Sequence, residues 1–138
     1  MVAATSLAVQ QPYPVIDPRM PVAIPYEAHV KQQLFLLLDC QEAFYGGAAR
    51  GGKSVALLMA ALQYVDIPGY SALIVRRTFP QLTIEGGLIP MSHAWLHDKA
   101  TWSAARRQWT FPSGATITFG HLDHDNDVYQ YAGSAFQF

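Results

Sequence analysis

Hydrophobic residues recur along the chain with helical and extended periods in turn, which predicts a mixed α/β fold. The segment SALIVRR, residues 71–77, has a continuous apolar centre, as expected for a parallel strand that is covered on both faces. RQWTF and ATITFGHL flank the turn residues 112–114, Pro-Ser-Gly, and together predict a β-hairpin. An amphipathic helix is predicted where apolar residues are spaced i, i+3, i+4 and i+7, at Val55, Leu58, Met59 and Leu62.

Three further segments carry weaker patterns. Residues 26–39 combine good helix formers with clustered apolar residues and predict a helix. EAFYG, residues 42–46, is a short apolar run that suits a buried strand. Residues 78–98 indicate helical pieces, which we expect to be interrupted at Gly86-Gly87 and at Pro90.

The two ends of the chain differ from this alternation. HLDHDNDVYQ, residues 121–130, predicts a polar loop, and YAGSAFQF, residues 131–138, looks like the approach to another strand. Residues 1–25 are predicted to form an extended arm that is ordered only if it lies on something. In this arm the prolines are too closely spaced for a helix or a paired strand, at Pro12, Pro14, Pro18, Pro21 and Pro25. Residues 26–138 then form a single α/β domain.

Composition fits a globular chain. Of the 138 residues, 51% are hydrophobic and 14% are charged, which argues against wholesale disorder. The net charge of −1 provides no overall electrostatic footprint for nucleic acid, so a DNA contact would be local, at Arg76-Arg77 or Arg106-Arg107. Cys40 is alone, which excludes an internal disulfide and a cysteine zinc site. The chain has no secretory signal and no run near the about 18 apolar residues of a membrane span, so we expect a soluble protein.

The stretch YGGAARGGKS, residues 45–54, contains the spacing G-x-x-x-x-G-K-[ST] of a phosphate-binding loop, the Walker A motif. In such a loop, backbone N–H groups approach a triphosphate so closely that Cβ atoms would collide, and glycine also reaches the positive φ angles required. Lys53 would contact the β and γ phosphates as a catalytic residue, and the Ser54 hydroxyl would coordinate Mg²⁺. The predicted ATP-binding residues are Gly47, Ala48, Ala49, Arg50, Gly51, Gly52, Lys53, Ser54 and Val55.

The alternative for this stretch is a glycine-rich turn that only caps a helix. Such a turn does not explain why a lysine and a hydroxyl stand at the motif's spacing, between a predicted strand and an amphipathic helix. We therefore expect a nucleotide-binding chain with ATP and Mg²⁺ as cofactors.

Three segments in order, YGGAARGGKS, LIVRRTFPQL and SGATITFGHL…YQYAGSAFQF, resemble the N-terminal ATPase region of large terminase subunits. These proteins are the motors that pump DNA into the preformed heads of tailed bacteriophages. The resemblance runs from about Gln32 to Phe138. It implies an α/β P-loop NTPase core with a parallel sheet, to which the antiparallel β-hairpin is added, so that residues 26–138 form a partial P-loop ATPase domain.

The resemblance also implies roles for single residues. Gln32 matches a glutamine that helps to read the adenine, with a surface helix glutamine as the equal alternative and Gln33 as the neighbouring one. Arg50 resembles a loop arginine that acts on the γ-phosphate, but it stands one position closer to Lys53 than is common, so a solvated loop cation is the alternative. Arg77, which closes the second predicted strand, matches a recurrent arginine, and a structural salt bridge is equally plausible.

Hydrolysis in this family also needs an apolar strand that ends in Asp-Glu, the Walker B strand, and packaging uses a C-terminal nuclease domain. Neither occurs in these residues, so we expect a fragment that is inactive alone. By resemblance, the partners of the full-length protein are double-stranded DNA, a portal protein and a small terminase subunit. The motor would act as a homo-oligomeric ring in the bacterial cytoplasm, without a membrane.

Two alternatives remain open. The chain is a non-catalytic prophage remnant or interaction module, or it belongs to another P-loop ATPase, such as a helicase-like protein. Two clusters resemble metal sites only superficially. The aspartates at 123, 125 and 127 are predicted to lie in a solvated loop, and the i, i+4 spacing of His93 and His97 lacks a third ligand.

Overall fold

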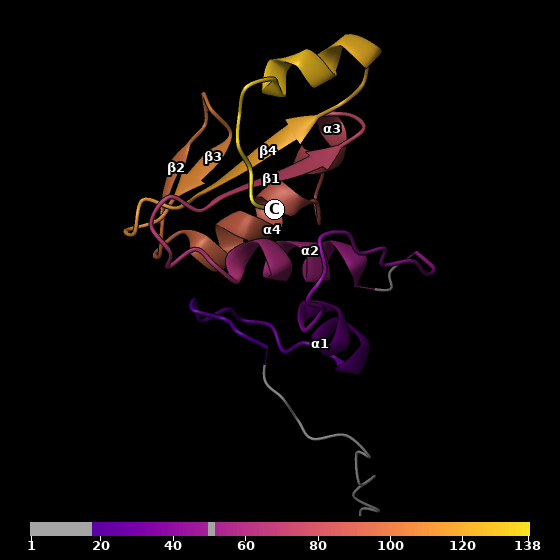
Figure 1. Ribbon diagram of the computed structural model, residues 1–138, viewed down its shortest axis with the longest axis vertical. Helices are drawn as coiled ribbons and strands as arrows, with labels where there is room; N and C mark the ends of the chain where they lie inside the picture. Colours follow the sequence, from indigo (N-terminus) through magenta and orange to yellow (C-terminus); the bar gives the residue numbers. More distant parts are fainter. Residues whose placement is uncertain (1–17, 50–51) are drawn as a thin grey trace, which may run out of the picture.

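A computed structural model describes residues 18–49 and 52–138 of the chain. The strands are β1 (Ser71–Arg76), β2 (Thr101–Ser103), β3 (Gln108–Thr110) and β4 (Thr116–His121). The helices are α1 (Val30–Leu36), α2 (Lys53–Leu62), α3 (Pro80–Thr83), α4 (Leu88–Leu96) and a 3₁₀ helix, η1 (Asp125–Tyr131). Within the described residues these strands form one sheet in the order β1-β4-β3-β2, and α2 and α4 lie against the face of it that points downwards in Figure 1.

The sheet combines a parallel pair with an antiparallel addition. β1 and β4 are parallel, with Ser71 opposite Thr116, and Ala72 and Ile74 at the centre of β1 are buried. β4 then pairs antiparallel with β3 across the turn at 112–114, so the predicted hairpin is confirmed. The chain therefore has the mixed α/β architecture that its alternating periods predict.

The amphipathic helix is also confirmed. Leu58, Met59 and Leu62 on α2 are buried in the main hydrophobic core, and Val55 packs half-buried at its margin. Tyr70, just before β1, donates its hydroxyl to the Ala61 carbonyl at 3.0 Å. Burial raises the pKa of Tyr70 to about 12, so this phenol stays protonated and keeps its hydrogen bond.

A cluster of aromatic rings joins the hairpin to α4. Trp109 at the centre of β3 is 1% exposed, and its Nε1 donates to the Ser92 hydroxyl at 2.9 Å. The His93 ring lies 4.8 Å from the ring centroids of both Trp102 and Trp109. The histidine ring is therefore held by aromatic packing.

The described part of the arm, residues 18–25, forms no helix or strand and lies on the domain. Its alternate residues Met20, Val22 and Ile24 are half-buried against the core. Arg19 pairs with the Asp66 carboxylate at 2.6 Å, just after α2. These contacts anchor the arm at the C-terminal end of α2.

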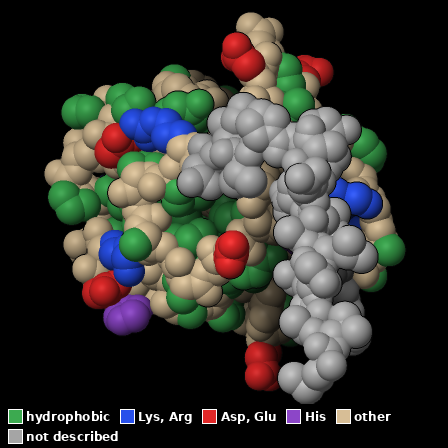
Figure 2. All heavy atoms as spheres, turned by 90° about the horizontal axis from the view of Figure 1, so that it is seen from below, with side chains coloured by type: hydrophobic (Ala, Val, Ile, Leu, Met, Phe, Trp, Pro, Cys, Tyr) green, Lys and Arg blue, Asp and Glu red, His purple; other side chains and the backbone are tan. Residues whose placement is uncertain are grey.

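Helix α1 is shorter than the predicted segment 26–39, and several large apolar side chains on it and just after it are exposed. The side chains exposed there are Val30, Leu34, Leu37 and Leu38. Figure 2 shows the side of the molecule on which α1 lies, where hydrophobic side chains reach the surface in several places.

The predicted strand at 42–46 is not formed, so this prediction is wrong. Phe44 is 96% exposed, and residues 42–46 are assigned to no strand. A strand requires a neighbour that takes its backbone N–H and C=O groups, and the described residues supply none here. Apolar composition alone therefore does not produce a strand at this position.

The C-terminal residues lie along the free edge of β1, as Figure 1 shows beside the label C. The Gln137 N–H donates to the Ser71 carbonyl at 2.8 Å, and the Leu73 N–H donates to the Phe138 carbonyl at 2.9 Å. Residues 134–138 are assigned to no strand, so the approach to another strand stays a prediction.

Two local predictions need correction. Pro90 does not interrupt a helix, because it stands in the first turn of α4, where a backbone N–H has no partner within the helix. The segment 121–130, predicted to be a polar loop, instead contains most of η1. Its polar side chains favour this turn structure, as described below for Asp127.

Candidate functional site

The glycine stretch leads directly into α2, whose N-cap is Gly52. Gly52 has φ +74°, in the left-handed region that glycine adopts without strain. Its carbonyl accepts the first helical N–H, from Ala56, at 2.9 Å. Gly47, at the start of the motif, has φ +140°. Two motif glycines thus have the positive φ angles that the phosphate-loop interpretation expects.

Lys53 folds back over the loop that precedes it. Its Nζ donates to the carbonyl of Gly47 at 2.8 Å and to that of Ala48 at 2.5 Å. An ammonium group has three N–H donors and no acceptor. Two of these donors bond the carbonyls of the loop, and the third is available to another acceptor. Ala49 is exposed, and the predicted residues Arg50 and Gly51 lie outside the described residues.

The Ser54 hydroxyl faces the end of β1. Arg76 Nη2 donates to Ser54 Oγ at 2.7 Å, across the space between the last residue of β1 and the first turn of α2. Arg77, which the family resemblance singled out, is exposed. The structure therefore brings Arg76 to the predicted site in place of its neighbour.

These groups line a cavity of about 320 Å³, here called the loop cavity. Its lining residues are Phe35, Ala43, Tyr45, Lys53, Ser54, Leu57 and Arg76. The rings of Phe35 and Tyr45 are in contact, with centroids 5.1 Å apart. The described lining thus contains two cationic side chains, a hydroxyl and an aromatic pair, but no carboxylate, which suits an anionic ligand with an apolar part.

Gln32 lies beside the loop and is fully buried, so its interpretation as a surface helix residue is wrong. Its Nε2 donates to the Gly52 carbonyl at 2.9 Å. Its Oε1 accepts from the His29 N–H at 3.0 Å and from the Tyr26 hydroxyl at 3.1 Å. The amide therefore ties α1 to the start of α2, and its role in reading adenine stays a prediction. Gln33 donates to the Ala28 carbonyl at 2.8 Å.

The acidic segment near the C-terminus stabilises its own turn. Asp127 Oδ2 accepts from the N–H groups of Asp123, at 2.8 Å, and His124, at 2.9 Å. These backbone hydrogen bonds hold the pKa of Asp127 below its usual value. Among the described residues, no group of three or more His, Cys, Asp or Glu is placed to hold a metal ion.

The Asp127 contacts predict a pH-dependent contribution to stability. The pKa of the Asp127 carboxyl is lowered in the folded state, so the carboxylate stabilises the fold at pH values above its unfolded-state pKa. This stabilisation is lost as the pH falls through the folded-state pKa. Asp127→Asn should therefore lower the thermal midpoint at pH 7, and its deficit should shrink on acidification as the wild-type carboxyl protonates. Thermal unfolding from pH 7 to pH 3 measures this, with Asp125→Asn as the control. An unchanging deficit across this range would contradict the assignment.

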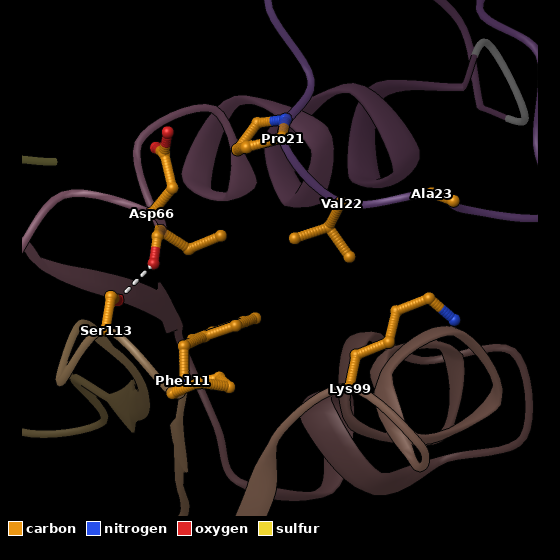
Figure 3. A pocket seen from close by; sticks show the side chains of 9 residues that line it. Pro21, Val22, Ala23, Asp66, Lys99, Phe111 and Ser113 are labelled. Carbon is orange, nitrogen blue, oxygen red and sulfur yellow. Dashed lines mark hydrogen bonds between the residues drawn. The ribbon is translucent and has the colours of Figure 1, made fainter.

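A second cavity, of about 450 Å³, lies under the arm and is drawn in Figure 3. Pro21, Val22 and Ala23 of the arm form one side, opposite Phe111. The polar groups that line it have partners within the chain. They are Asp66 with Arg19, Ser113 with the Val65 carbonyl, and Lys99 with Asp98. This cavity therefore results from the packing of the arm and gathers no reactive group.

The loop cavity is built by α1, residues 43–45, the start of α2 and the end of β1.

No helix in the described ranges is both long and apolar enough to cross a membrane. Comparison of the chain with protein-family models, with curated proteins and with solved structures found no match.

Proposed function

We propose that the chain is the nucleotide-binding part of a large terminase subunit, an ATP-driven DNA-packaging motor, and that the loop cavity binds the phosphates of ATP. The observation that carries this proposal is the convergence of Lys53 and Arg76 on the start of α2, beside a loop with left-handed glycines. A helix N-terminus offers free N–H groups and partial positive charge, and two cationic side chains add to its attraction for phosphate.

The residues present fit a magnesium ion that arrives with the nucleotide. Mg²⁺ prefers hard oxygen ligands and usually keeps several waters, so one protein hydroxyl beside phosphate oxygens is a suitable set. Ser54 supplies that hydroxyl at the cavity wall. The ion would neutralise phosphate charge, while Lys53 and the backbone of the loop orient the phosphates.

The P-loop core and the packaging role are parts of this proposal. The site lies at the carboxyl end of β1, which is where parallel α/β sheets bind their ligands. The identification with terminases depends on the three sequence segments and their order. Double-stranded DNA, a portal protein, a small terminase subunit and a ring of copies are proposed as partners on the same ground.

A non-catalytic nucleotide-binding module is the second candidate. One observation favours it, since no Asp or Glu lines the described part of the loop cavity. Hydrolysis requires a carboxylate or a comparable group that positions water. Because the chain is expected to be inactive alone in either case, the reading frame after residue 138 separates the two. An in-frame apolar strand that ends in Asp-Glu favours the motor, and a frame without one favours the module.

Removal of Lys53 tests the phosphate role directly. Titration of the chain with a fluorescent ATP analogue and Mg²⁺ should give saturable binding. Lys53→Ala should weaken it about tenfold or more, because a charge-assisted hydrogen bond to phosphate is lost. Lys99→Ala is the matched control, since that ammonium pairs with Asp98 under the arm and should leave the affinity unchanged. Equal affinities of wild type and Lys53→Ala would refute the proposal.

A further inference from the structure

The hydrogen bond between Arg76 and Ser54 connects a cation to the very oxygen that a magnesium ion would use. We propose that Arg76, which donates to the Ser54 hydroxyl, is a ligand of the terminal phosphate of the nucleotide. In this inference, which rests on the proposed function, Arg76 exchanges the hydroxyl for phosphate when Mg²⁺ takes the hydroxyl.

The first step of the argument is that two cations cannot share this hydroxyl. Magnesium binds oxygen at about 2.0–2.1 Å. Arg76 Nη2 stands 2.7 Å from the same Ser54 oxygen, so the divalent ion and the guanidinium would be held against each other. Like charges at such a distance repel strongly in a partly buried site. The guanidinium must therefore leave the hydroxyl when the ion is bound.

The second step concerns where the released guanidinium goes. Arg76 is half-buried and lines the loop cavity, whose described lining contains no carboxylate to receive it. Lys53 already occupies the carbonyls of Gly47 and Ala48. A guanidinium presents a planar fork of donors that matches phosphate oxygens. The anionic group within its reach is then the phosphate of the ligand.

The strand supports this placement. Side chains alternate between the two faces of a strand, so Arg76 shares the face of Ala72 and Ile74, which are buried. Helix α2 contacts β1, and its residue Ser54 meets Arg76. Arg77 is one position further along and is exposed. Arg76 therefore belongs to the site because of its register in β1.

The experiment compares the affinity of the full chain for a fluorescent ATP analogue with Mg²⁺ and with EDTA. Arg76→Ala should lose about tenfold or more in affinity with Mg²⁺, because a charged hydrogen bond to phosphate is missing. In EDTA the loss should be smaller, within about threefold, because Ser54 still holds the wild-type arginine. If Arg76 acted only through its long-range charge, the loss of affinity would be larger in EDTA than with Mg²⁺, since phosphate without Mg²⁺ is more negative. Arg106→Ala removes an exposed arginine elsewhere and should change neither affinity.

Arg76→Lys keeps the charge but not the planar fork, so it should recover part of the Mg²⁺-dependent affinity. This variant also serves if Arg76→Ala does not fold, which circular dichroism shows. The role of Arg76 would be overturned if Arg76→Ala lost the same affinity with and without Mg²⁺, or if it kept full affinity. It would also be overturned if only Arg77→Ala lost affinity. In those cases, weakened binding by Lys53→Ala would still support the nucleotide site. No saturable binding by the wild type would overturn both.

Discussion

Replacing Trp109 with alanine is expected to lower the free energy of unfolding by about 3–5 kcal/mol, the usual cost of removing a buried tryptophan side chain. Trp109 is 1% exposed and contacts His93 and Trp102 between the sheet and α4. Small domains have a total stability of about 5–15 kcal/mol, so this one substitution removes a large part of it. Urea unfolding followed by circular dichroism measures the loss.

Two smaller substitutions separate the ring from its hydrogen bond. Trp109→Phe should cost about 1–2 kcal/mol, because Ser92 still donates to the Ile89 carbonyl when the indole N–H is gone. Ser92→Ala should cost about 1–3 kcal/mol, since it leaves that N–H buried without an acceptor. Tyr129→Ala, at a mostly exposed aromatic residue, is the control and should leave stability nearly unchanged. Similar losses for Trp109→Ala and Tyr129→Ala would contradict this account of the core.

The parts of the fold that local patterns encode could be predicted. The period of α2 is present in its own residues, and the hairpin at 108–121 is specified by a turn between two extended runs. The apolar centre of β1 indicates burial in any context. In each case the signal comes from residues near in sequence, although β1 also requires β4 as its distant partner.

The prediction failed where the outcome depends on distant residues. Residues 42–46 have an apolar composition that suits a strand, yet a strand exists only where another strand pairs with it. The failure at Pro90 has a different cause, because proline disrupts a helix interior but is tolerated in the first turn. Its effect depended on where the helix begins, and that boundary was not visible in the sequence.

The candidate site was predicted in part. The motif located Lys53 and Ser54, because its spacing reflects the local path of the backbone. It could not identify Arg76, because a continuously apolar strand does not show which of its alternating positions faces α2. The burial of Gln32 was hidden for another reason: its partner, the Gly52 carbonyl, is 20 residues away.

Gly52→Ala tests the contact between Gln32 and Gly52. It is expected to lower the free energy of unfolding by about 2–5 kcal/mol, through two separate effects. Holding alanine at the left-handed φ of +74° costs about 1–2 kcal/mol. The new Cβ would also collide with Gln32 Nε2, and displacing that buried amide costs about a further 1–3 kcal/mol. Gly114→Ala is the matched control, because Gly114 has φ +89° and open space around its Cβ position. Urea unfolding of both variants gives the two costs.

A double-mutant cycle then isolates the collision. In a Gln32→Ala background the amide is gone, and the remaining close atom, His29 Nε2 at 3.2 Å, is the end of a flexible side chain. Gly52→Ala should then lower the free energy of unfolding by only about 1–2 kcal/mol, close to the effect of Gly114→Ala in the wild type. The losses in free energy of unfolding of the two single variants would then add up to more than the loss of the double variant. Strict additivity of Gln32→Ala and Gly52→Ala would mean that the two residues are not in contact. Because Gly52 immediately precedes Lys53, this contact also fixes the start of the helix that the proposed phosphate site requires.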